Sequence, residues 1–284
     1  MPSTIICRVA LLLVAMVCGA ICNSGRPPSA QNVTIELGKV PQTLIEQRMN
    51  RLRSKDFERE AELKAIFREA GCSGEQLSEE VVRRKDPPNV ICTLPGTAQS
   101  LIIVSAHFDH AEAGSGAVDD WSGASLLPSL YEALRSDPRK HTFQFIGFSD
   151  EEAGLVGSQY HVHHLNREQL NAIKAVVNLE CLGLSSPEVW VHVADPVLLG
   201  YLGQLSRAAQ TPVPGVDIQK VGDDDTQPFR DKKVPTITIH SLTQATLPIL
   251  HSKKDQLAAV NLERLYESFH FVARYLAVID QLLD

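Results

Sequence analysis

Long hydrophobic runs are scarce in this 284-residue chain. One apolar stretch near the N-terminus, VALLLVAMVCGAIC at residues 9–22, is too short to span a bilayer comfortably, and no other segment is long and apolar enough. Aromatic residues make up only 6% of the chain, the net charge is −7, and no basic stripe interleaved with aromatics occurs. These absences exclude a multi-spanning membrane protein and argue against a nucleic-acid partner.

The N-terminal apolar run has the flanks of an export signal. Arg8 precedes it, and the polar sequence NSGRPPSAQN follows it. We therefore expect a signal peptide at residues 1–24, a flexible lead-in at 25–42 and one folded domain at 43–284. The protein would then be secreted or periplasmic, with no membrane contact beyond the signal segment. An N-terminal membrane anchor that is not cleaved is the alternative.

Cysteines are few once the signal is set aside. Only Cys72, Cys92 and Cys181 lie beyond the N-terminal segment. In an oxidising compartment we expect a disulfide between Cys72 and Cys92, which closes a loop of about 20 residues and contributes roughly 3 kcal/mol in the chain-entropy model. Two buried thiols are the alternative. Cys181 would remain a buried thiol next to Glu180.

Apolar periodicity predicts strands that alternate with helices. Strands are expected at residues 89–94, 101–105, 142–148, 175–179, 189–193 and 234–240. Helices are expected at residues 43–70, 124–134, 155–165 and 196–209, and after Asn261, a good N-cap residue. This alternation is typical of an α/β domain with a mostly parallel sheet, in which ligands bind beyond the carboxyl ends of the strands.

Metal-binding residue types recur where the predicted strands end. They are His107, Asp119, Glu151, Glu152, Glu180 and His251, in the segments LIIVSAHFDH, GAVDDWSGAS, TFQFIGFSDEEAGLVGS, AVVNLECLG and ILHSKKD. A hydrophobic core gives no packing reason for strand after strand to end in an imidazole or a carboxylate. Both groups are zinc ligands in proteins. The pattern therefore indicates a metal site at one edge of the sheet.

The same segments resemble the family-28 zinc metallopeptidases, the bacterial leucyl aminopeptidase type with two co-catalytic zinc ions. The elements HxD, D-D-x-S-G, E-E-x-G-x-x-G-S and H-S-x-x-D occur in the family's order, and the likeness extends from about Pro88 to the C-terminus. The resemblance implies a single domain with a mixed, mostly parallel twisted sheet that helices flank on both faces.

The resemblance also implies a role for each candidate residue. One zinc ion would take His107, Asp119 and Glu180. The other would take Asp119, Glu152 and His251, so that Asp119 bridges the two ions. Glu151 would be the general base. In the best-known aminopeptidases of the family the position of Glu180 holds Asp, a shorter carboxylate with the same donor atoms.

Two further acids complete the predicted site. Asp109 lies two residues after His107 and can hold the second imidazole nitrogen, which fixes the tautomer; we place it with Glu151 among the catalytic residues. Asp120 would lie behind the ligands and support Asp119.

One segment departs from the family pattern. Where many relatives read S-D-H, this chain reads VGDDDTQPF, with Thr226 in place of the histidine, and the group that polarises the scissile carbonyl is not identified. We expect residues 223–225 at the rim of the pocket. The imidazoles of His161, His163 and His164 are expected on a solvated helix face and not in a second metal site.

These observations predict an exported zinc-dependent aminopeptidase. It would hydrolyse the N-terminal bond of peptides with a free N-terminus, using a water between two Zn²⁺ ions and Glu151 as base. One alternative is an aminoacyltransferase like glutaminyl cyclase, with the same fold and one Zn²⁺. A non-catalytic binding module on this fold is the other.

Overall fold

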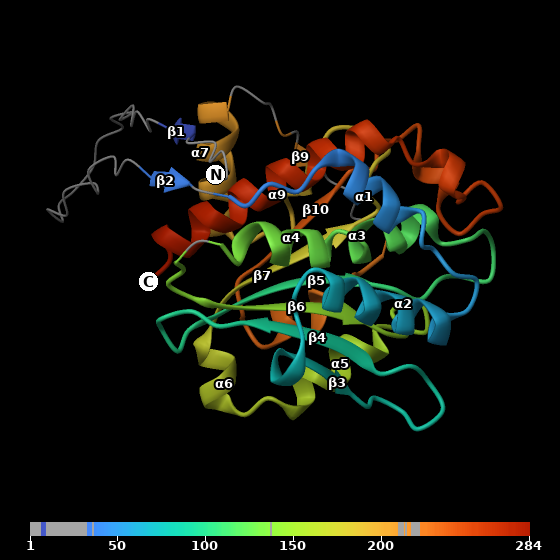
Figure 1. Cartoon of the computed structure of the whole chain (residues 1–284), viewed down its shortest axis with the longest axis horizontal. Helices are drawn as coiled ribbons and strands as arrows, with labels where there is room; N and C mark the ends of the chain where they lie inside the picture. The colour runs from blue at the N-terminus through green and yellow to red at the C-terminus, as the bar shows by residue number, and fades with distance from the viewer. Residues whose placement is uncertain are drawn as a thin grey trace, which may run out of the picture.

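The computed structural model describes residues 7–9, 33–35, 37–136, 138–209, 213, 215–216 and 222–284. The strands of its central sheet are β3 (Leu77–Glu80), β4 (Asn89–Leu94), β5 (Leu101–His107), β6 (Thr142–Phe148), β7 (Ile173–Glu180), β8 (Glu188–Trp190), β9 (Gly215–Val216) and β10 (Thr236–His240). They lie in the order β3-β4-β6-β5-β7-β10-β8-β9 (Figure 1). Within the described residues four neighbouring pairs of this sheet are parallel and three are antiparallel.

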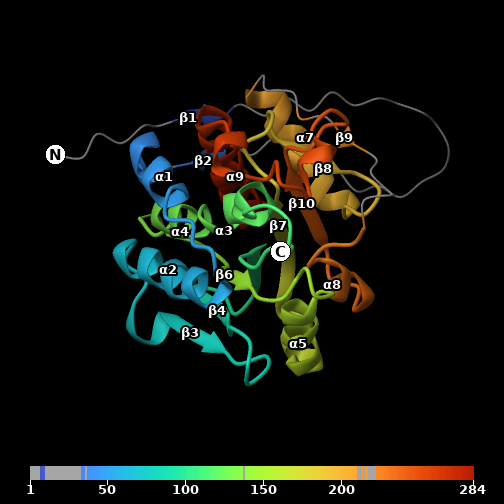
Figure 2. The same cartoon turned by 90° about the vertical axis from the view of Figure 1, so that its right-hand side faces the viewer.

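Helices cover both faces of this sheet, as the two views of Figures 1 and 2 show. The α-helices are α1 (Gln42–Met49), α2 (Asp56–Glu69), α3 (Ser122–Ala124), α4 (Leu127–Leu134), α5 (Val156–His164), α6 (Arg167–Ala172), α7 (Pro196–Ala209), α8 (Gln227–Asp231) and α9 (Leu262–Leu282). Short 3-10 turns lie at Gly74–Gln76, Leu247–Ile249 and Leu257–Ala259, and a π turn lies at Ala117–Trp121. The predicted α/β fold class, with a mixed and mostly parallel sheet, is confirmed.

Two hydrophobic cores lie on the two faces of the sheet. In β5, Ile102 and Val104 belong to the larger core, which α2, α4 and α9 cover. Ile103 points the other way, into a smaller core with Val162 of α5 and Phe229 of α8. This alternation follows from the two-residue period of a strand and explains why the predicted strands read as continuous apolar runs.

The predicted helix boundaries need correction in the N-terminal half. The helix expected over 43–70 is two helices, because the chain leaves α1 at Asn50 and resumes in α2 at Asp56. Arg51 and Arg53 in the connection both pair with Glu62 of α2, which fixes this break. The stripe expected over 124–134 is likewise split into α3 and α4, whereas α7 and α9 lie where the periodicity placed them.

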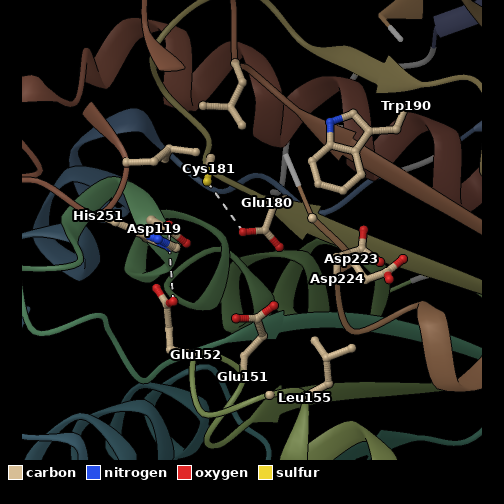
Figure 3. Close-up of a pocket in the computed structure, with 14 residues that line it drawn as sticks. Asp119, Glu151, Glu152, Leu155, Glu180, Cys181, Trp190, Asp223, Asp224 and His251 are labelled. Carbon is tan, nitrogen blue, oxygen red and sulfur yellow. Dashed lines mark hydrogen bonds and ion pairs between the residues drawn. The ribbon is translucent and has the colours of Figure 1, made fainter. Parts of the chain in front are cut away.

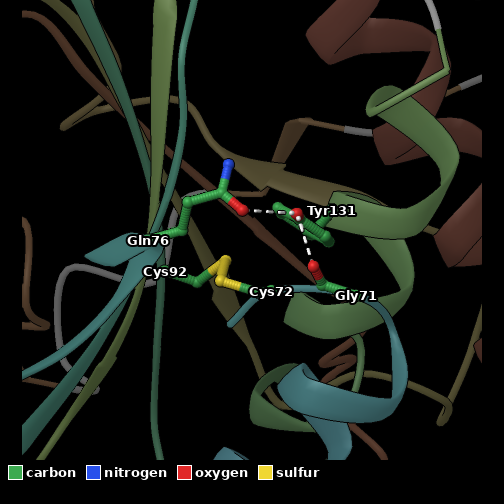
Figure 4. The surroundings of a disulfide bond; sticks show 5 residues. All are labelled: Gly71, Cys72, Gln76, Cys92 and Tyr131. Atoms are coloured by element: carbon green, nitrogen blue, oxygen red, sulfur yellow. Dashed lines mark hydrogen bonds between the residues drawn. A yellow bond between two sulfur atoms is a disulfide. The ribbon is translucent and has the colours of Figure 1, made fainter. Parts of the chain in front are cut away.

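A disulfide joins the end of α2 to the sheet. Cys72 follows α2, Cys92 lies in β4, and their Cα atoms are 6.3 Å apart (Figure 4). The hydroxyl of Tyr131 donates to the carbonyl of Gly71 beside it, at 3.3 Å. Both cysteines are fully buried and belong to the larger core.

The N-terminal expectations fall largely outside the described residues. Only the strands β1 (Cys7–Val9) and β2 (Val33–Ile35), which pair antiparallel, and residues 37–42 represent the expected signal peptide and lead-in. Among the residues that the structure describes, no helix is long and apolar enough to cross a membrane.

Candidate metal centre

The candidate ligands meet at one edge of the sheet because its four central strands run in the same direction. Strands β6, β5, β7 and β10 are mutually parallel, so their carboxyl ends lie together. His107 ends β5, Glu180 ends β7, and Glu151 and Glu152 follow β6 after two residues. The chain order also reverses between β5 and β7, which is where ligands bind in such sheets.

Asp119 lies between the two histidines. Its Oδ1 is 3.1 Å from Nε2 of His107, and its Oδ2 is 3.2 Å from Nε2 of His251. Nε2 of His107 is also 3.5 Å from Oε1 of Glu180, and Nε2 of His251 is 3.0 Å from Oε2 of Glu152. Each carboxylate oxygen of Asp119 therefore faces a different pair of side chains, made of one imidazole and one glutamate.

Asp109 contacts three of these residues: the side chain of His107 and the main chain of Glu151 and Glu152. Its Oδ1 is 3.3 Å from Nδ1 of His107 and accepts a hydrogen bond from the main-chain N–H of Glu151 at 3.0 Å. Its Oδ2 accepts from the N–H of Glu152 at 3.1 Å. One buried carboxylate thus orients an imidazole and the turn that carries both glutamates.

Asp120 and Asp255 hold the segment around Asp119. Oδ1 of Asp120 accepts from the N–H of Gly123 at 3.1 Å and from the N–H of Cys181 at 3.0 Å, which links this segment to the end of β7. The carboxylate of Asp255 accepts from the N–H of Val118 at 2.7 Å and of Asp119 at 3.3 Å. Because these acceptors are buried, the bonds fix the bridging carboxylate relative to both neighbouring loops.

The glutamates of the cluster have raised pKa values. Burial, and then the charge of Asp119, raises the pKa of Glu152 to about 7. Burial also raises the pKa of Glu151 well above its usual range, and the charges of Asp225 and Glu180 add to the rise. Carboxylates that repel one another in a buried space are stabilised in their charged form by a cation.

The pKa values of the two imidazoles, of His107 and His251, are both raised, which favours the protonated forms. The hydrogen bond with Asp119 raises the pKa of His251 to about 9. Burial lowers the pKa of His107, but the charge of Glu151 and hydrogen bonds to Asp109 and Asp119 outweigh it and raise that pKa well above its usual range. The carboxylates around the two imidazoles therefore favour positive charge at this site.

The residues present fit a metal ion. Ligand atoms of Asp119, Glu152 and His251 lie within 4.8 Å of one another, and Oε1 of Glu152 is a buried oxygen that has no hydrogen-bond partner among the described residues. Nitrogen and oxygen donors of this kind suit Zn²⁺, and a carboxylate that faces two sides suits a pair of ions.

A cavity of about 340 Å³ opens onto the cluster. Figure 3 shows the carboxylates of Glu151, Glu152 and Glu180 pointing into the same space, with Trp190 on the opposite side. Leucines complete the apolar part of the wall: Leu155, Leu242 and Leu250. The wall of the cavity therefore combines carboxylates with apolar side chains.

Every predicted ligand reaches this site, but the expectations about two groups of nearby residues hold only in part. Asp223 is exposed and lines the pocket, as expected. Asp224 lines the pocket too but is buried and accepts hydrogen bonds from Thr226 and Thr238, and Asp225 is buried as well. His161 is also buried, with Nδ1 at 3.1 Å from Glu80.

Sequence reasoning missed two buried groups near the ligands. Within the part of the chain that the structure describes, both oxygens of Asp225 lie without a hydrogen-bond partner, and burial raises the pKa of this carboxyl to about 8. Arg59 of α2 is fully buried against the loop after His107. No local pattern reveals either residue, since a single charged residue in a turn or on a helix is usually exposed.

Comparison with known proteins agrees with the site. The model of peptidase family M28 matches residues 89–276. Aminopeptidase YwaD of Bacillus subtilis is 26% identical over 201 residues, which are 68% of this chain and 43% of YwaD. The chain therefore spans less than half the length of this relative.

Solved structures share the fold. The LapA aminopeptidase of Legionella pneumophila superimposes with a TM-score of 0.74 at 23% identity, over 86% of this chain and 73% of LapA. A glutaminyl cyclase from an Acidobacteriales bacterium superimposes with a TM-score of 0.67 at 18% identity, over 84% of this chain and 93% of the cyclase. Because the family model covers well over half of the sequence and includes all the clustered ligands, the chain belongs to peptidase family M28.

Proposed function

We propose that this protein is an exported aminopeptidase that uses two zinc ions. The observation that carries the proposal is the position of Asp119, whose two oxygens face two different imidazoles at 3.1 and 3.2 Å. A single ion needs only one of these groups. A carboxylate shared between two His–Glu groups is the arrangement expected of residues that would hold a pair of ions.

Each residue of the cluster then has a role. His107, Asp119 and Glu180 would hold one zinc ion, and Asp119, Glu152 and His251 the other. When bound, zinc supplies Lewis acidity and lowers the pKa of water. Asp109 keeps the imidazole of His107 in one tautomer through the contact at Nδ1.

Glu151 is the proposed general base. It lines the cavity and is not needed as a ligand in either group. Its carboxylate accepts a proton from the attacking water as the oxygen bonds to the peptide carbonyl carbon. It then donates that proton to the amine nitrogen as the C–N bond breaks, which leaves a carboxylate and a free amine.

The charge of the cavity favours the N-terminal end of a peptide. Several carboxylates line the cavity, and one of them, Asp223, is exposed. Such a field attracts a protonated α-amine and repels a carboxylate. Lys253 and Lys254, which could have held a C-terminus, are exposed on the surface after His251.

Three measurements test the proposal. Elemental analysis of active protein should give two zinc ions per chain, and aminoacyl-anilides should be hydrolysed. Paired peptides with free and acetylated N-termini should differ: mass spectrometry should show residues released one at a time from the free form only. A ladder from the C-terminus, or internal cuts, would contradict an aminopeptidase.

A cyclase is the second candidate. The glutaminyl cyclase of the comparison is matched over 93% of its length, more than either aminopeptidase. A cyclase would bind one zinc ion and release ammonia from peptides that begin with glutamine. One tight zinc ion together with ammonia release, and no anilide hydrolysis, would replace our proposal with this one.

A further inference from the structure

Arg59 is a buried arginine that lies outside the part of the chain matched by the family model. It projects from α2 and has no exposed surface. Within the described residues, Arg59 donates four hydrogen bonds, all to main-chain carbonyl oxygens. The acceptors are the carbonyls of Arg53 at 2.8 Å, Phe108 at 3.1 Å, Asp109 at 3.5 Å and Ser115 at 2.5 Å.

Three of these carbonyls belong to one loop, residues 108–116. The loop connects His107 at the end of β5 to the turn that presents Asp119. It carries Asp109, the carboxylate that contacts His107 and accepts from the N–H groups of Glu151 and Glu152. The position of this loop therefore affects ligands of both proposed zinc ions.

The guanidinium fills the space inside the loop. Its planar fork reaches both ends at once, with Nη1 on the carbonyls after His107 and Nη2 on the carbonyl of Ser115. Gly116 has a φ of 56°, and a Cβ added to it would lie 2.9 Å from Nη1 of Arg59. Loop and guanidinium are thus in close contact at both ends of the turn.

The charge of Arg59 is balanced without a direct ion pair in the described residues. Burial lowers the pKa of the guanidinium, while the charges of Asp56, Asp109 and Asp255 raise it. Two of these, Asp109 and Asp255, are the carboxylates that hold the ligand segments. An arginine remains protonated in this setting, and a buried cation bonds carbonyl oxygens more strongly than a neutral donor does.

We propose that Arg59 is a positioning residue of the metal centre, which fixes loop 108–116 so that Asp109 and Asp119 meet their ligand partners. This inference rests on the proposed metal ligands. Arg59 would affect metal binding without being a ligand itself and without touching substrate. Removing groups that orient metal ligands typically costs 10–100-fold in metal affinity.

The experiment compares three variants of the full chain. R59M removes the charge and all the donors, and R59K keeps the charge but not the fork. R48M is the matched control, because Arg48 is also buried on an N-terminal helix but bonds Ser129 and Glu132 of α4. Zinc affinity is measured by competition with a chromophoric chelator, the visible spectrum of the Co²⁺ form reports ligand geometry, and melting of the chelated protein reports stability.

We expect R59M to bind zinc at least 10-fold more weakly and to alter the Co²⁺ spectrum, with R59K between it and the unmodified protein. R48M should melt earlier but keep both metal properties. If R59M does not fold, R59K carries the test, and an unchanged affinity and spectrum in R59K would overturn the inference. Equal affinities in a folded R59M would also overturn it, whereas an unmodified protein that binds no zinc would remove the proposed function and the inference together.

Discussion

One carboxylate oxygen of Asp119 faces each histidine, so substitutions around Asp119 should separate the two proposed metal sites. Asp119→Ala removes an acceptor from both groups and should abolish tight binding of both ions. His251→Ala should weaken mainly one ion, because the group of His107 and Glu180 stays intact. Zinc counts after dialysis check this. Equal losses in the two variants would contradict a bridging role for Asp119.

The neighbouring glutamates should have separate phenotypes. Glu151→Gln removes the proton acceptor but not a ligand, so activity should fall by about 10²–10⁴ with zinc content unchanged. Glu152→Gln should lose zinc, because its Oε2 lies 3.0 Å from His251. Anilide hydrolysis and elemental analysis on the same preparations decide between them. Reversed phenotypes would exchange the two roles.

His240 makes stability depend on pH. Burial lowers its pKa to about 3, while the unfolded residue titrates near 6.5. As the pH falls below about 6.5 the unfolded chain binds a proton that the folded one does not, so stability is lost towards pH 3.

The variant His240→Asn tests this dependence. Asn cannot take up the proton but can still accept from the N–H of Leu242, as Nδ1 of His240 does at 3.0 Å. Between pH 7 and pH 5 the unmodified protein should lose about 2 kcal/mol more than the variant. Urea unfolding measures the stability of both proteins at each pH. A chelator is present so that metal release does not contribute. Parallel pH curves would rule out this titration.

At the scale of elements, the disulfide links α2 to β4. Replacing Cys72 and Cys92 with Ala should cost roughly 3 kcal/mol of unfolding free energy, because the loop is closed over 20 residues. Zinc content should not change, since neither residue contacts a ligand segment. Non-reducing mass spectrometry of exported protein should show the linked peptide pair; free thiols at both positions would contradict it.

Helices were predictable where a long apolar stripe marks one face, and strands were predictable where the sequence is a continuous apolar run. The spacing in α9 is a clear example, and Asn261 caps this helix by accepting from the N–H of Arg264. The strand β3 was missed because its sequence LSEE is polar and lies at the edge of the sheet. The short helix α6 was also missed, although Asn166 and Gln169 form a capping box at its N-terminus.

At the scale of the whole molecule, the cluster of candidate ligands was predictable from strand ends and motif order, and so were the places of Asp109 beside His107 and of Asp120 behind Asp119. His107 and Glu180 end strands, which local sequence reveals. The hydrogen bonds that Asp109 accepts from a turn 42 residues further along the chain could not be predicted, because they depend on how the strands pair. Arg59 is buried only because α2 packs over loop 108–116, and a single charged residue on a polar helix face gives no hint of that contact.

The strand order has a consequence for how the protein folds. Strand β5 lies between β6 and β7, and β10 joins next to β7, so every one of these parallel contacts closes a long loop. Contacts between residues far apart in sequence slow folding, because loop-closure entropy is lost before the contact forms. His107 and His251 are 144 residues apart and meet only through Asp119. High-affinity zinc uptake should therefore be among the last events of folding, and its rate would report when the sheet is complete.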